Sequence, residues 1–152
     1  MASTNDKEFR EKLESLSASQ QRQVAALFVQ RVFGLSNDVR IRAALDVAMR
    51  PEISDAELAV VSQAANAAKV ESYAQCGKDT DWNTQAGLFV AKAAVSCINP
   101  IAEGKNLAWE AAMQVRVART CEAASGDVKD HKEAEAQYAI LDDFLRKQGN
   151  RP

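Results

Sequence analysis

The stretch "IRAALDVAMRPEISDAEL", which runs from Ile41 to Leu58, decides the fold because it ends one helix and begins the next. Pro51 ends the first helix, because proline pushes the preceding residue out of the helical region. Ser54 and Glu57 then have the spacing of a capping box, which begins a new helix. Before Pro51, apolar residues recur at the i, i+3, i+4, i+7 and i+8 positions of a helix, namely Ile41, Ala44, Leu45, Ala48 and Met49.

The rest of the chain repeats these start and stop signals. Alanine, the best helix former, is abundant, whereas the chain has only six glycines and three prolines. We expect helices at about 5–16, from the capping box of Ser17 and Gln20 to about Phe33 with Gly34 as its stop, and from Ser36 or Asn37 to Pro51. We expect four more helices. The first runs from Ser54 to about Gln75 with Gly77 as its stop, and the second runs from Asp81 or Trp82 to Asn99-Pro100. The third covers about 106–124 and is ended by Gly126, and the fourth covers about 128–148.

Seven helices with short connections predict an all-α protein. The chain has 152 residues, 47% of them hydrophobic and 26% charged, which is the balance of one globular domain. We therefore expect a single compact bundle of about six to seven largely antiparallel helices that spans residues 1–152, with frayed ends at about 1–5 and 149–152.

Charge and hydropathy exclude several classes of function. The 19 basic and 21 acidic side chains are interspersed, whereas nucleic-acid binding needs Lys and Arg gathered on one face. No apolar run approaches the roughly 20 residues of a membrane span, and the N-terminus has no apolar signal segment. We therefore expect a soluble, cytoplasmic protein without nucleic-acid or membrane partners. In that compartment the three cysteines, Cys76, Cys97 and Cys121, are expected to be buried apolar side chains.

The segment "CGKDTDWNTQAG", Cys76–Gly87, resembles the first half of a calcium loop because Asp79, Asp81 and Asn83 alternate. The match fails where a glycine and a bidentate glutamate are required, since Thr84 and Val90 stand there. We interpret the segment as a junction in which Gly77 stops one helix and Thr80 or Asp81 caps the next.

No other motif predicts a metal site or an active site. Asp127, His131 and Glu135 share a helical spacing, but His131 is the only histidine, and a solvated charged face explains the pattern. The sequence contains none of the common hydrolase, kinase or dehydrogenase motifs, so we expect no cofactor, and an enzyme is disfavoured.

The segment "RVFGLSNDVRIRAALDVAMRPEISDAELAVVSQAANAAKVES", Arg31–Ser72, resembles the predicted alanine-rich, all-helical immunity proteins of bacterial toxin systems. The similarity continues through "WNTQAGLFVAKAAVSCI" and "NLAWEAAMQVRVARTC". It implies a protein without catalytic activity that binds and blocks a toxin. It names no functional residues.

Two arginines of one helical face, Arg116 and Arg119, lie near Trp109 in the sequence and could bind an anion or an acidic partner. The alternative is that they cover the core and pair with nearby glutamates. Trp82, Trp109, Tyr73 and Phe144 are candidate contacts for a partner protein where they are exposed, with core packing as the alternative.

The leading hypothesis is a small helical protein-interaction protein. The alternative is a helical-bundle enzyme or small-ligand-binding protein with a pocket between alanine-rich helices. Self-association into a homo-oligomer is a third hypothesis.

Overall fold

The computed structural model describes residues 5–36, 38–78, 81–98, 106–124 and 132–149, and within them the chain is helical and contains no strand. This confirms the predicted all-α fold of packed helices. None of the helices in these ranges is both long enough and apolar enough to cross a bilayer. The elements are α1 (Asp6–Glu14), α2 (Ala18–Gln30), the 3-10 turn η1 (Phe33–Leu35), α3 (Val39–Ala48), α4 (Asp55–Lys78), α5 (Trp82–Ile98), α6 (Leu107–Ala124) and α7 (Glu133–Gly149).

The predicted capping signals begin the helices. The Ser17 hydroxyl accepts from the backbone N–H of Gln20, and the Gln20 side chain accepts from the backbone N–H of Ser17, which completes the box at α2. At α4, the Ser54 hydroxyl accepts from the Glu57 backbone N–H at 3.1 Å. The Glu57 carboxylate instead pairs with Arg50 at 2.5 Å, so only half of this box forms.

Several predicted helix ends are wrong. Helix α2 ends at Gln30, and Gly34 lies in η1, because the chain closes a tighter turn there with a bond from Leu35 N–H to Val32 C=O. Gly77 does not stop α4, which runs to Lys78, since glycine only weakens a helix interior.

The caps near α3 and the chain ends also differ from expectation. Asp38, rather than Ser36, caps α3 and accepts from the backbone N–H of Arg40 at 2.9 Å. Asn5 caps α1 instead of fraying. Helix α7 is first described at Glu133, with its end at Gly149. Some predicted helix caps and stops lie outside the described residues, namely Asn37, Asn99, Pro100 and Gly126. The remaining residues of the predicted frayed ends, 1–4 and 150–152, also lie outside them.

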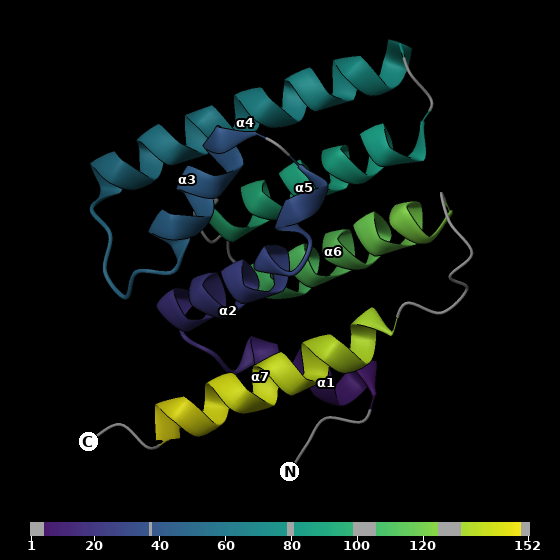
Figure 1. The fold of residues 1–152 in the computed structure, drawn as a ribbon. Helices are drawn as coiled ribbons and strands as arrows, with labels where there is room; N and C mark the ends of the chain where they lie inside the picture. Colours follow the sequence, from purple (N-terminus) through teal and green to yellow (C-terminus); the bar gives the residue numbers. More distant parts are fainter. Residues whose placement is uncertain (1–4, 37, 79–80, 99–105, 125–131, 150–152) are drawn as a thin grey trace.

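Helix α5 lies between α4 and α6, and α2 and α3 pack against it (Figure 1). Helices α1 and α7 lie beside α6 at the far end from α4. Small side chains allow this layering, because alanine lets helix backbones approach closely. The buried residues of α5 are Ala86, Leu88, Val90, Ala91, Ala93, Ala94, Val95, Cys97 and Ile98.

Ala86, Val90, Ala93 and Cys97 of α5 are buried, whereas Phe89 is only half-buried and lies beneath the Lys92 ammonium group. Cys97 and Cys121 are buried as predicted, and burial raises the pKa of the Cys97 thiol. Cys76 is only half-buried, because it lies near the exposed end of α4.

An aromatic cluster joins α1 to the rest of the bundle. The buried ring of Phe9 packs against Phe28, Trp109 and Tyr138, with centroid distances of 5.7, 6.1 and 5.2 Å. These large side chains fix α1 against α2, α6 and α7.

Candidate binding surfaces

A groove with a volume of about 510 Å³ runs between α4 and α6 on the side of α5. Its lining comes from segments far apart in the sequence, because α4, α5 and α6 lie side by side. The lining residues are Lys69, Val70 and Tyr73 of α4, Lys92, Val95 and Ser96 of α5, and Gln114 of α6.

The described lining of the groove is cationic, with Lys69 and Lys92 and no carboxylate. The Gln114 Oε1 atom is shielded from solvent and has no hydrogen-bond partner among the described residues. A buried carbonyl oxygen without a donor is unfavourable, and turning the amide over would leave its nitrogen in the same position. Beside these polar groups, Tyr73 and Val70 are 68% and 63% exposed. The groove can therefore take an acidic or donor group together with an apolar one.

The solvent-facing side of α4 is also apolar. Val60 is 66% exposed, and Ala56, Ala67 and Ala74 are exposed as well. The opposite side buries Ala65 and Ala68 in the core. Because α4 is apolar on both sides, its sequence has no amphipathic period that would mark this outer face in advance.

Of the predicted partner contacts, Trp82 and Tyr73 lie on the surface. Trp82 begins α5 and is 47% exposed, although it does not line the groove. Trp109 is half-buried against Phe9, with the Arg10 guanidinium over its ring at 5.3 Å. Phe144 is buried in the core.

Arg116 joins three elements inside the protein. Its guanidinium donates to both carboxylate oxygens of Asp6, at 2.8 and 3.0 Å, and to Gln137 Oε1 at 2.9 Å. It also lies over the rings of Phe9 and Tyr138. Arg116 therefore holds α1 and α7 against α6.

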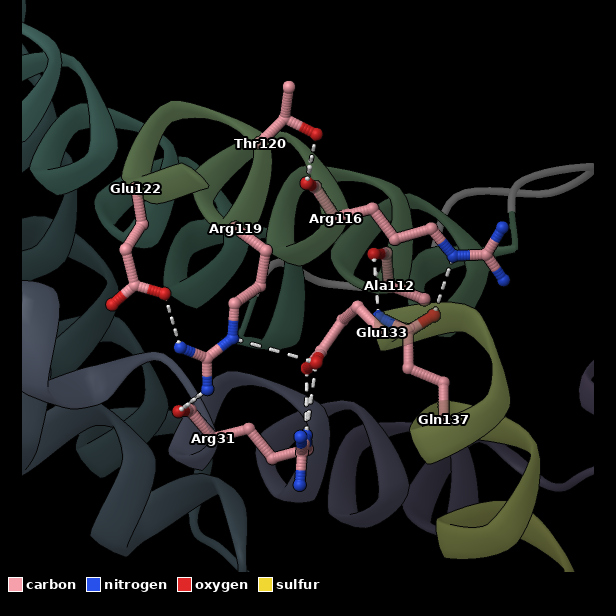
Figure 2. A network of polar contacts seen from close by, with 8 residues as sticks. All are labelled: Arg31, Ala112, Arg116, Arg119, Thr120, Glu122, Glu133 and Gln137. Atoms are coloured by element: carbon pink, nitrogen blue, oxygen red, sulfur yellow. Dashed lines mark hydrogen bonds and ion pairs between the residues drawn. The ribbon is translucent and has the colours of Figure 1, made fainter. Parts of the chain in front are cut away.

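Arg119 belongs to a second network, around the fully buried carboxylate of Glu133 (Figure 2). Arg31, which directly follows α2, donates to Glu133 at 2.7 Å, and the Arg119 Nε lies 3.6 Å from the other oxygen. Arg119 also pairs with Glu122 and donates to the Arg31 carbonyl at 2.8 Å. Nearby, the buried Gln137 amide donates to Ala112 C=O at 2.9 Å. Both arginines therefore cover the core and pair with acidic side chains, as the alternative interpretation of the sequence expects.

The described residues contain no group of three or more His, Cys, Asp or Glu side chains placed to hold a metal ion. Asp81 accepts from the backbone N–H of Asn83 at the start of α5, as the helix-junction interpretation predicts. Asp79, Thr80, Asp127 and His131 lie outside the described residues, and Glu135 is exposed.

Comparison of the chain with protein-family models, curated proteins and solved structures finds no match. The class that the fold defines is a small all-helical protein.

We expect Glu133→Ala to lower the free energy of unfolding by about 3 kcal/mol, because it removes a fully buried carboxylate that pairs with Arg31 and Arg119. Glu122→Ala is the matched control: it removes the exposed partner of the same Arg119 and should cost less than about 1 kcal/mol. Urea unfolding followed by circular dichroism measures both. Equal losses in the two variants would contradict the structural role of Glu133.

The Arg116 guanidinium donates to Asp6 and holds the pKa of that carboxyl below its usual range, although burial acts in the opposite direction. The Tyr138 hydroxyl also donates to Asp6, at 2.7 Å. A lowered folded-state pKa gives stability that is present above the unfolded value and is lost as pH falls through the folded one.

We therefore expect the stability difference between wild type and Asp6→Asn to shrink as pH falls from about 5 to about 3. Thermal melts at the two pH values test this, with Glu14→Asn as a control for general acid effects. A difference that stays constant over this range would contradict the contribution of the Asp6 charge.

Proposed function

We propose that this is a cytoplasmic protein-interaction protein without catalytic activity, which holds a segment of a partner protein in the groove between α4 and α6. The observation that carries the proposal is the exposed Tyr73 ring beside Lys69 and Lys92, next to a groove of about 510 Å³. The resemblance to immunity proteins supports the further proposal that the partner is a toxin, which is blocked by binding.

The chemistry of the groove favours an acidic partner segment with one apolar anchor. Protein interfaces draw most of their affinity from a few aromatic or Arg residues at the centre, and Tyr73 is placed for that role. Lys69 and Lys92 would attract carboxylates and orient the partner as it approaches. The unsatisfied Gln114 Oε1 would accept a backbone or side-chain N–H of the partner.

The size of the groove also favours a second candidate function, the binding of a small ligand, with or without a reaction. Small-molecule sites have volumes of roughly 300–1,000 Å³ and a few convergent polar groups. A small ligand would use the same lysines and Gln114, but it would not require Tyr73 to be exposed at the rim.

The test is capture of partners from the native cell, with their abundance quantified by mass spectrometry. We expect one protein to be retained by the wild type and by Lys147→Glu, an exposed control on α7. The variant Lys69→Glu/Lys92→Glu should retain it at least about tenfold less, because two attractions become repulsions. Relief of that protein's toxicity by co-expression would support the immunity role.

Equal capture by both variants would exclude the groove as the docking site. Capture of no protein, together with a small molecule that co-purifies with the wild type but not with Lys69→Glu/Lys92→Glu, would overturn the proposal in favour of the ligand-binding alternative.

A further inference from the structure

The polar groups of the groove between α4 and α6 lie within about one helical turn. The lining residues are at most four positions apart on each of two helices, from Lys69 to Tyr73 on α4 and from Lys92 to Ser96 on α5. Four positions of a helix rise about 6 Å, whereas an extended chain advances about 3.4 Å per residue. The groove therefore engages about two residues of an extended partner segment.

The two lysines of the groove keep their positive charge available to an occupant. Among the described residues, no carboxylate forms an ion pair with Lys69 or Lys92. The Lys92 ammonium lies 4.7 Å from the centre of the Phe89 ring, and this contact holds the side chain without neutralising its charge. Two cations from neighbouring helices therefore favour an anionic group between them.

The groove also offers a hydrogen-bond acceptor and an apolar wall. Gln114 Oε1 has no donor among the described residues, and a rotation of this side chain toward the groove would let it accept an N–H of the occupant. Val95 and Val70 line the same groove, and they are 5% and 63% exposed. An apolar side chain that packs against them leaves water, which favours binding.

The last residue of a polypeptide carries the three complementary groups on one Cα atom, namely a carboxylate, an N–H and a side chain. An internal acidic residue does not, because its carboxylate is its own side chain. In an extended segment the next side chain points to the opposite face, so a glutamate and the apolar residue beside it do not enter one groove together. The small extent of the groove therefore favours a chain end over an internal acidic segment.

We propose that the groove captures the C-terminal end of a partner protein whose last residue is apolar. The inference rests on the proposed function and names the part of the partner that the groove holds. The terminal carboxylate lies between Lys69 and Lys92, and the last N–H donates to Gln114 Oε1. The last side chain packs against Val95, and Tyr73 covers the residue before it. Capture of a terminal carboxylate is a recurring mode of peptide recognition.

Backbone amide shifts of the nitrogen-15-labelled chain test the proposal in a titration with acetyl-Gly-Gly-Leu that ends in a free carboxylate. We expect this acid peptide to shift amides of the groove with a Kd of about 1 mM or below. Its C-terminal amide should bind at least about tenfold more weakly, because it lacks the charge. Lys69→Gln/Lys92→Gln should reduce the acid peptide to the affinity of the amide peptide, whereas Lys147→Gln, an exposed control on α7, should change neither.

A third peptide, acetyl-Gly-Glu-Gly-Leu-Gly amide, carries its carboxylate on an internal side chain, and we expect it to bind no better than the amide peptide. Equal binding of the internal and acid peptides would overturn the chain-end inference, as would an acid peptide that leaves the groove amides unshifted. Neither result would touch the proposed function, because capture with Lys69→Glu/Lys92→Glu measures docking of the whole partner. That experiment fails only where the groove is not the docking site.

Discussion

The burial of α5 between α4 and α6 is the constraint on which the rest of the structure depends. Among the described helices, only α5 packs extensively against both α4 and α6, and α2 and α3 also pack against α5. A helix covered on so many sides must present small side chains, because neighbouring backbones can approach only where the side chains are short. Ala86, Ala91, Ala93 and Ala94 meet that requirement.

The two sides of the layer formed by α4, α5 and α6 are covered differently. On the α6 side, α1 and α7 are held by aromatic packing around Phe9 and by the buried charge of Glu133. A buried carboxylate is stable only with its partners in place, so this contact also fixes which part of α7 faces α2 and α6. On the α4 side, no described helix covers the outer face, which leaves Val60, Val70 and Tyr73 in contact with solvent. The asymmetry explains why the groove of the proposed function is bordered by α4.

The features that could be predicted from the sequence are those that interactions between neighbouring residues determine. The capping box at Ser17 and the start of α5 at Trp82 follow from hydrogen-bonding groups within a few residues. The helical stripe from Ile41 to Ala48 follows from its period, although Met49, which was expected to continue it, is exposed. Glycine was a poor guide to helix ends, since Gly77 stays inside α4: glycine permits a break without forcing one.

The surfaces were harder to predict because they depend on how distant segments meet. The groove brings Lys69, Lys92 and Gln114 together from three helices, and no spacing in the sequence links them. Arg116 and Arg119 were candidates for anion binding from the sequence, but in the fold α1 and α7 supply carboxylates that pair with them. Helix α4 as a whole has no amphipathic period that distinguishes its outer face, because its core-facing side is equally apolar.

Native-state hydrogen exchange measured for individual amides tests the central role of α5 most directly. Amides of α5 should exchange only through global unfolding, because α2, α3, α4 and α6 all pack against this helix. Those of α1 and α7 should exchange through partial openings of lower free energy. Exchange of α5 amides through openings of lower free energy than those of α7 would contradict this account.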